Sequence, residues 1–387
     1  MWPLRPHLII LYILRMQSEP TTAPNDTRID LKSLTRNELG EVCEELGLPS
    51  YRATQLTRWL HQKGARSFDE MSNLSKELRE KLETHYSIHH IDVDQRQTSA
   101  DGTVKYLFRL DSTTDEKIES VLIPDLQPDG HPKRLTVCVS SQVGCVFGCS
   151  FCATGKMGLF RNLSPGEIVD QIRIIDRDAQ ETYGKGVTNV VYMGMGEPLH
   201  NYKSVVESAA ILSSEAGLDL SPKRITVSTV GLTRQIEQLA DEQQPFRLAI
   251  SLHAAHDAKR TEIMPINESL NLKRLEKAVR YYHRKTEQPV TYEYLLFDQF
   301  NDHVKDARQL SSIAHWIPSK VNIIMYNPVA GVTLKRARED RLDAFMKELI
   351  SHGVTATVRR SRGDDIDAGC GQLAIRDGAP KGKSMRR

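Results

Sequence analysis

The sequence CVSSQVGCVFGCSFCATGKMGLFR, residues 138–161, contains four of the six cysteines of this 387-residue chain. Three of them, Cys145, Cys149 and Cys152, follow the spacing C-x3-C-x2-C and place three thiolates on one short loop. An iron–sulfur cubane normally takes four cysteines, one for each iron. A loop that supplies only three leaves one iron free to bind another molecule. The sequence therefore predicts a three-cysteine iron–sulfur site on this loop.

A disulfide framework, a zinc site and simple core packing each fit these cysteines less well. Six cysteines in 387 residues are too few for a disulfide framework, which is typical of small secreted domains. A zinc site usually combines two ligand pairs from separate loops, and the sequence has no second pair of this kind. Buried cysteines are common in cores, but three within eight residues, flanked by Gly144 and Gly148, would pack a core in an unusual way.

From residue 135 onward, short apolar strands alternate with longer helices. The expected strands are 135–140, 187–193, 224–229, 246–251, 290–296 and 321–325, and the expected helices are 164–179, 201–215, 232–241, 272–286, 303–316 and 337–352. Ser164 and Glu167 form a capping box around Pro165 at the start of the first helix. Six such units predict an α/β fold with a parallel sheet, an open (β/α)6 partial barrel, because a closed barrel needs eight.

Polar residues and glycines follow the expected strands at the edge where such sheets bind ligands. They are Gly194, Gly196, Glu197, Pro198, Ser228, Ser251, Leu252, His253 and Asn327. The glycines let backbone approach a ligand closely, and Glu197 can accept a hydrogen bond from a charged amine. Each residue alone is more often an ordinary loop residue, but their common placement predicts a binding pocket.

Four stretches together resemble the RlmN/Cfr family of radical S-adenosylmethionine (SAM) RNA adenine methyltransferases, and most closely its RlmN type. They are CVSSQVGCVFGCSFCATG (138–155), MGMGEPLHNY (193–202), SLHAAHDAKRTEIMPIN (251–267) and RGDDIDAGCGQL (362–373). The resemblance covers about residues 31–375 and implies the same partial barrel. It also implies one [4Fe-4S] cluster on Cys145, Cys149 and Cys152, with SAM on the open iron. SAM contacts are expected from Gly196, Glu197, Ser228, Ser251, Leu252, His253 and Asn327.

The resemblance also gives roles to two cysteines outside the cluster spacing. Without it, Cys370 in a loop of small residues would be a packing residue or an incidental thiol. The resemblance implies that Cys370 takes a methyl group from one SAM and that a second SAM is cleaved to activate that methyl group for addition to adenine. Cys138 then helps to remove the ring proton and forms a transient disulfide with Cys370. Glu119 is expected to act as a proton acceptor.

Sequence patterns and the resemblance together divide the chain into five parts. They are a leader at 1–28 that is disordered or precedes the true start, a helical RNA-binding accessory domain at 29–90, a β extension at 91–134, the radical SAM core at 135–375 and a basic tail at 376–387. The β extension contains an expected hairpin, 93–98 and 104–110, around a two-residue type I′ turn at Asp101-Gly102.

The accessory domain is expected to contain three helices, the first opened by a capping box of Thr35 and Glu38. Its basic residues either bind an RNA backbone or form a solvated surface, and the family's use of this domain favours RNA. They are Arg52, Arg58, His61, Lys63 and Arg66. The net charge is only +2, so an RNA partner must be bound by local patches of this kind.

The resemblance implies a cytoplasmic monomer that methylates C2 of an adenosine in 23S rRNA, and of the adenosine 3′ to the anticodon in some tRNAs. It implies two SAM molecules per turnover and an electron donor such as flavodoxin. The apolar run at 8–14 is too short for a membrane span, which needs roughly 20 residues. Two alternatives remain open: C8 methylation of the rRNA adenosine, as in Cfr, and a non-catalytic, metal-stabilised RNA-binding protein.

Overall fold

The computed structural model describes residues 28–111 and 115–374. The predicted leader at 1–28 therefore lies outside the described residues except for Arg28, and the predicted basic tail at 376–387 lies outside them entirely. None of the helices within the described ranges combines the length and the apolar character that a bilayer crossing requires.

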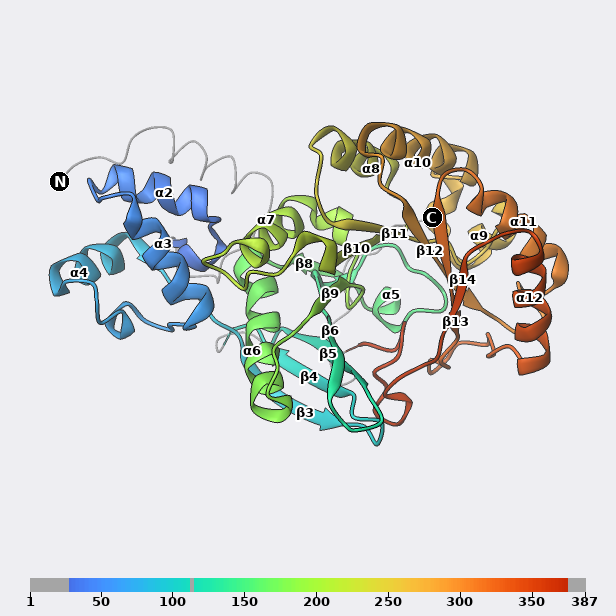
Figure 1. The fold of residues 1–387 in the computed structure, drawn as a ribbon, viewed down its shortest axis with the longest axis horizontal. Helices are drawn as coiled ribbons and strands as arrows, with labels where there is room; N and C mark the ends of the chain where they lie inside the picture. The colour runs from blue at the N-terminus through green and yellow to red at the C-terminus, as the bar shows by residue number, and fades with distance from the viewer. Residues whose placement is uncertain (1–27, 112–114, 375–387) are drawn as a thin grey trace.

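One ten-stranded sheet forms the larger part of the molecule (Figure 1). Its strands are, in spatial order, β14 (Ala356–Arg359), β13 (Ser319–Met325), β12 (Val290–Leu296), β11 (Arg247–Ser251), β10 (Ile225–Thr229), β9 (Asn189–Tyr192), β6 (Pro132–Cys138), β5 (Lys117–Leu126), β4 (Val104–Arg109) and β3 (Asp92–Thr98). Pairings from β14 to β6 are parallel, and those from β6 to β3 are antiparallel. The predicted open partial barrel, with its six parallel strands, is confirmed.

Helices follow the parallel strands close to the predicted ranges. They are α6 (Pro165–Tyr183), α7 (Tyr202–Ser213), α8 (Thr233–Asp241), α10 (Leu272–Thr286), α11 (Val304–Ala314) and α12 (Glu339–Ser351). The capping box predicted for Ser164 and Glu167 opens α6, with Pro165 in the first turn. In Figure 1, α8, α10, α11 and α12 lie along the outer rim of the sheet. Helices and strands share one hydrophobic core, and its burial is the main favourable term in folding.

Several short elements of the core were not predicted, and two of them extend the pattern of parallel strands and helices. The strand β14 adds a seventh parallel strand beside β13, and the helix α9 (Asp257–Ile263) follows β11. The strand has four residues and the helix has seven. Elements this short lack the repeated apolar spacing from which strands and helices are recognised in a sequence.

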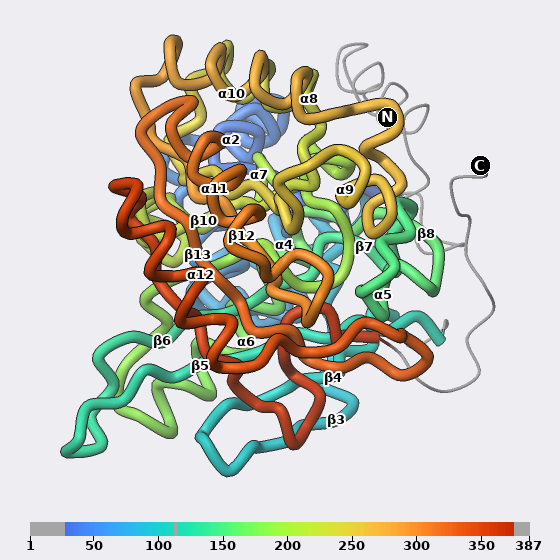
Figure 2. Tube along the Cα trace, turned by 90° about the vertical axis from the view of Figure 1, so that its right-hand side faces the viewer, coloured from blue at the N-terminus to red at the C-terminus, as the bar shows by residue number. Residues whose placement is uncertain are grey.

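The turn between β3 and β4 differs from the prediction. A type I′ turn needs positive φ at both central residues, but of Asp101 and Gly102 only the glycine has one, at +84°. The N–H of Ser99 donates to the carbonyl of Thr103 at 2.8 Å, which leaves a three-residue loop. Asp101 instead accepts a hydrogen bond from the N–H of Gly363 at 3.0 Å. Figure 2 shows this C-terminal segment, in red, beside β3 and β4.

The N-terminal helical region has a hydrophobic core of its own. It contains α2 (Arg36–Glu45), α3 (Tyr51–Thr57), a π-helical stretch (Arg58–Gln62) and α4 (Lys76–His85), and the short strands β1 (Ile29–Asp30) and β2 (Tyr86–Ser87) pair its two ends. The capping box predicted for Thr35 and Glu38 is present. The three predicted helices are therefore confirmed, and the boundary at residue 90 stays a prediction.

A buried ionic cluster joins this region to α6. The Nζ atom of Lys32 lies 2.7 Å from Oδ2 of Asp170, and the two side chains are 0% and 2% exposed. Arg173 donates to the other oxygen of Asp170 at 3.0 Å. His61 is buried at this junction, where burial lowers its pKa to about 3. The prediction that His61 belongs to a basic face is wrong, because this side chain faces α6 rather than solvent and is uncharged.

Candidate active site

The carboxyl ends of the parallel strands surround a cavity of about 1140 Å³, including its open mouth. Most of the predicted site residues line this cavity: Cys138, Cys145, Cys149, Cys152, Gly196, Glu197, Ser228, Ser251, His253 and Cys370. Leu252, Asn327 and Glu119 are not part of the lining. Asn327 lies directly behind it, since a side chain at Gly369 would meet its amide nitrogen at 1.9 Å. The fold therefore gathers predicted site residues around one space, although Cys138 and Cys370 are 232 positions apart in the sequence.

The three cysteines of the C-x3-C-x2-C spacing lie on a loop that is held at both ends. Cys145 ends β7 (Gln142–Cys145), which pairs with β8 (Gly158–Asn162), and Cys152 is the N-cap of the short helix α5 (Ala153–Met157). Gly144 has a φ of +77°, and a Cβ atom there would lie 1.9 Å from the carbonyl oxygen of Gly158. Only glycine fits that close crossing of β7 and β8.

The donor set of this loop fits a cubane cluster. Burial raises the pKa of Cys145 to about 12 and raises that of Cys149 well above its usual value, and the neighbouring thiols raise both further. Thiols with such a pKa need a bound cation to become thiolates, and metal binding then releases their protons. A cubane binds each cysteine through a separate iron, so three thiols spread around one cavity suit it.

Glu197 is a buried carboxyl group in the wall of the cavity. It is 3% exposed, and its two oxygens accept hydrogen bonds from the N–H groups of Leu199 at 3.1 Å and Val230 at 2.9 Å. Burial raises its pKa to about 7, although these hydrogen bonds favour the charged form. A carboxylate held in this way is suited to a positively charged amine, because the amine would offset its loss of hydration.

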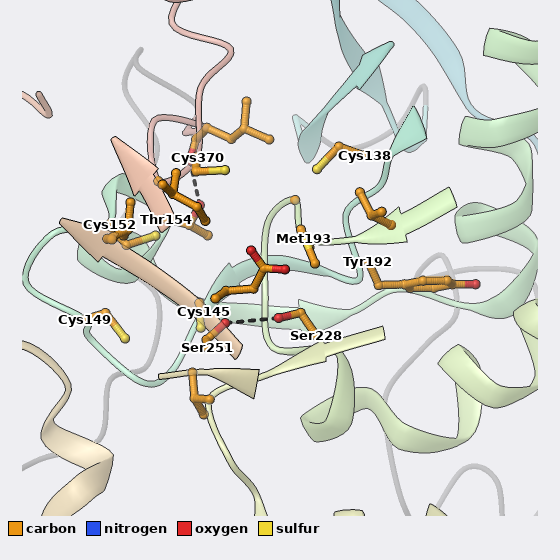
Figure 3. Close-up of a pocket in the computed structure, with 18 of the residues that line it drawn as sticks. Cys138, Cys145, Cys149, Cys152, Thr154, Tyr192, Met193, Ser228, Ser251 and Cys370 are labelled. Atoms are coloured by element: carbon orange, nitrogen blue, oxygen red, sulfur yellow. Dashed lines mark hydrogen bonds between the residues drawn. The ribbon is translucent and has the colours of Figure 1, made fainter. Parts of the chain in front are cut away.

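The polar groups at the ends of β10 and β11 complete this wall. The hydroxyls of Ser228 and Ser251 lie 3.0 Å apart, as Figure 3 shows. His253 accepts the N–H of Leu295 on Nδ1 at 3.1 Å, and burial lowers its pKa to about 3. The ring is therefore neutral with its proton on Nε2, which leaves an N–H donor for a ligand.

Cys138 and Cys370 lie at the other end of the cavity. Cys138 ends β6, and Cys370 lies in the loop that follows β14. Figure 3 shows both sulfurs directed into the same space. They are close enough that a negative charge on Cys370 would raise the pKa of Cys138, which burial already raises to about 12. Two thiols facing each other across a cavity form an arrangement suited to a nucleophile and a second thiol that resolves its adduct.

The loop of Cys370 is attached directly to the cysteine loop. The N–H of Ala153, the residue after Cys152, donates to the carbonyl of Gly371 at 2.8 Å. The hydroxyl of Thr154 donates to the carbonyl of Leu373 at 2.6 Å (Figure 3). The backbone rather than the thiol makes these contacts, so the sulfur of Cys370 remains available for chemistry.

Comparison with known proteins decides the family. Residues 29–88 match the family described as ribosomal RNA large subunit methyltransferase N-terminal domain, and residues 139–310 match the radical SAM superfamily. A protein named as a probable dual-specificity RNA methyltransferase RlmN from Salinibacter ruber is 50% identical over 356 residues, covering 92% of this chain and 96% of that protein. The chain belongs to the RlmN family.

Two further relatives agree with RlmN membership. The dual-specificity RNA methyltransferase RlmN of Campylobacter fetus is 44% identical and covers 90% of this chain and 98% of its own. The crystal structure of a radical SAM methyltransferase from Sphaerobacter thermophilus superposes with a TM-score of 0.81 at 41% identity, covering 89% of this chain and 99% of the other. Membership of the radical SAM superfamily implies a [4Fe-4S] cluster and SAM as the cofactors.

Glu119 is not among the residues that line the cavity of this RlmN family member. It is buried on β5, its Oε1 lies 3.2 Å from Nζ of Lys105, and its Oε2 accepts the N–H of Ala374 at 2.9 Å. Glu119 thus anchors the end of the segment that carries Cys370. Its role as a proton acceptor stays a prediction.

Three charged residues near the site were missed in the sequence. Arg260 is fully buried and donates to the carbonyls of Leu252 at 3.1 Å and Val230 at 2.6 Å, which fixes the loops after β10 and β11. Glu293 and Arg359 line the cavity itself. Glu293 could have been recognised from the sequence, since it is the one charged residue in the apolar strand VTYEYLL of β12. Arg359 could not have been recognised in the same way, because the strand β14 that it ends was not predicted.

Glu197→Gln is expected to weaken SAM binding by about thirtyfold or more, because losing one partner of a buried charge pair costs about 2–5 kcal/mol. The amide has the same shape, so the cavity should persist. In the unaltered protein, SAM affinity should fall about tenfold per pH unit as the pH drops below about 7, since Glu197 must lose its proton to hold an amine. The variant should lack this dependence.

Calorimetric titration of the anaerobic, cluster-loaded protein with SAM measures both effects. Glu181→Gln, at an exposed position of α6, is the control and should bind SAM normally. Equal affinities for the Glu197 variant and the unaltered protein at pH 8 would contradict this role.

Proposed function

We propose that this chain is a radical SAM RNA methyltransferase that methylates C2 of an adenosine in 23S rRNA and of the adenosine 3′ to the anticodon in some tRNAs. The observation that carries the proposal is the placement of Cys138 and Cys370 in one cavity with the three-cysteine loop. The names of the RlmN relatives, which describe dual-specificity RNA methyltransferases, support the two substrate classes.

Cys145, Cys149 and Cys152 would hold the cluster, and the wall formed by Glu197, Ser228 and His253 would hold SAM. When bound, the cluster supplies an electron for the reductive cleavage of SAM, and SAM supplies the methyl group. Glu197 would accept the amine of the methionine moiety. The N–H of His253 and the hydroxyl groups would orient the rest of the ligand.

Cys370 would act as the nucleophile: its thiolate attacks the methyl carbon of SAM, and the sulfonium sulfur leaves with the bonding electrons. The methyl carbon of the resulting thioether would give up one hydrogen atom to the adenosyl group of a second SAM, which acts as the oxidant, and would then bond to C2 of adenine. The adduct would return one electron to the cluster as the ring proton leaves. Cys138 would help to remove the ring proton and, once that proton has passed to solvent, its thiolate would attack the sulfur of Cys370. The Cys138–Cys370 disulfide forms as the carbon–sulfur bond breaks, the carbon keeps the electron pair and gains a proton, and a thiol reductant restores both thiols.

The remaining parts of the proposal concern the partners. The N-terminal helical region would help to bind RNA, with Arg52, Arg58, Lys63 and Arg66 contacting phosphates. An electron donor such as flavodoxin would reduce the cluster. We expect a monomer in the cytoplasm, where 23S rRNA and tRNA are made.

Nucleoside analysis of RNA treated with the enzyme tests the function. We expect 2-methyladenosine in digests of 23S rRNA and of some tRNAs after incubation with the reconstituted protein, SAM and a reductant. Appearance of 8-methyladenosine without 2-methyladenosine would assign the C8 activity instead. No methylated nucleoside, together with zinc and no iron in anaerobically purified protein, would favour the non-catalytic alternative.

A further inference from the structure

Arg359 is the only lysine or arginine among the described residues that line the cavity. It ends β14, the edge strand that extends the barrel beyond the six expected strands. Its Nη1 lies 4.0 Å from the sulfur of Met193. The guanidinium is near enough to both Cys138 and Cys370 to lower the pKa of each thiol. One cation thus lines the same cavity as the two sulfurs that the proposed reaction joins.

A buried carboxyl group fixes the position of this guanidinium. Glu293 on β12 is 3% exposed, and its Oε2 lies 3.6 Å from Nη1 of Arg359. The amide of Asn322 donates to its Oε1 at 2.8 Å, and the hydroxyl of Thr357 donates to Asn322 at 2.7 Å. A buried carboxylate needs a positively charged or hydrogen-bonding partner to offset its loss of hydration. The chain of contacts from Thr357 to Arg359 therefore sets where the positive charge lies.

The sulfur of Cys138 is in an environment that opposes negative charge. Burial and, as a smaller cause, a charge on Cys370 raise its pKa to about 12. Two groups act in the other direction: the guanidinium of Arg359 and the N–H of Met193. A thiol with such a high pKa is scarcely ionised at neutral pH and attacks sulfur slowly. The resolving step needs a thiolate, so it depends on the groups that favour one.

We propose that Arg359 is the positioning residue that stabilises the thiolate of Cys138 when it forms to resolve the adduct on Cys370, because its guanidinium is the cation fixed in the cavity that both sulfurs line. The inference rests on the proposed function for the step that it serves. In that step the Cys138 sulfur attacks the Cys370 sulfur, the S–S bond forms, the S–C bond breaks, and the carbon leaves with the electron pair. Arg359 is unchanged, and its charge balances the negative charge before the bond forms.

Arg359→Lys and Arg359→Met test the proposal as a matched pair, because the two side chains are similar in length and differ in charge. The readout is the rate at which iodoacetamide alkylates Cys138 at pH 8, followed by mass spectrometry on the cluster-loaded, full-length protein without RNA or SAM. A nearby positive charge lowers a pKa by about one unit or more. The tenfold gain in thiolate is partly offset by its lower nucleophilicity. We expect the lysine variant to react about threefold faster than the methionine variant.

Two controls accompany this measurement. Arg360→Met, at the exposed neighbouring position, should leave alkylation of Cys138 unchanged. Cys43, buried in the N-terminal core, should remain protected in every variant and so reports an intact fold. Equal alkylation rates in the lysine and methionine variants would overturn the proposal, whatever happens to RNA methylation.

A second measurement separates this inference from the proposed function. With RNA present, the methionine variant should still methylate Cys370 but should accumulate a covalent protein–RNA adduct several-fold above the unaltered protein, visible on a denaturing gel. Failure to methylate Cys370 in the unaltered protein would refute the proposed function. Methylated Cys370 and normal turnover in the methionine variant would refute only the role of Arg359.

Discussion

Replacing Cys370 with alanine is expected to lower RNA methylation by at least about a thousandfold, as removal of a covalent nucleophile does. Among residues 28–111 and 115–374, the backbone of Gly371 and Leu373 rather than the Cys370 side chain attaches the loop to Ala153 and Thr154. The cavity and SAM binding should therefore persist. Exposed positions of this kind change the free energy of unfolding by about 0.5 kcal/mol or less.

Transfer of a labelled methyl group from SAM to RNA measures the loss, and SAM titration with thermal unfolding shows whether the rest of the site is intact. Cys43→Ala is the matched control, since this cysteine is buried in the N-terminal core and should leave methylation nearly unchanged. Methylation of adenine by the Cys370 variant would show that the two-cysteine chemistry does not apply to this chain.

The features that the sequence predicted well are those with local signals. The capping box at Ser164 and Glu167 depends only on neighbouring residues, and it opens α6 as expected. Apolar strands followed by amphipathic helices predicted the order of the parallel sheet, because each unit can pack only in a limited number of ways. The cysteine loop was recognised because its three thiols are within eight residues.

The features that the sequence missed depend on contacts between distant segments. Asp101 and Gly102 favoured a tight hairpin turn, but Asp101 binds the N–H of Gly363 and the loop is longer. Glu119 was expected to accept a proton, but in the structure it contacts Lys105 and Ala374. No local sequence pattern connects these two residues to Glu119. Pattern and spacing cannot report such partners, since these arise only when the sheet is assembled.

His61 shows the same limit for an electrostatic expectation. Basic residues lie close to it in sequence, at Arg58 and Lys63, so a surface position was expected. The side chain is instead fully buried, and both ring nitrogens have no hydrogen-bond partner among the described residues. Burial holds its pKa at about 3, while an unfolded chain would bind a proton near 6.5. The free energy of unfolding should therefore decrease as the pH falls from about 6.5 toward 3, because the unfolded state binds the extra proton.

Lys32→Met is expected to destabilise the protein by about 3–5 kcal/mol, because it leaves the buried carboxylate of Asp170 with less compensation. Burial raises the pKa of Asp170, but the charges of Lys32 and Arg173 outweigh burial and hold that pKa below its usual value. The stability that the ionic cluster contributes is therefore present above pH 3.8 and is lost in stronger acid. Denaturant unfolding at pH 7 measures the loss.

The double variant with Asp170→Leu should recover most of the lost stability, since Arg173 is 13% exposed and can turn toward solvent. Lys76→Met, whose side chain is 84% exposed, is the control and should change stability little. If Lys32→Met unfolds like that control, the ionic cluster does not hold the N-terminal region to α6, and the hydrophobic contacts at the junction must do so.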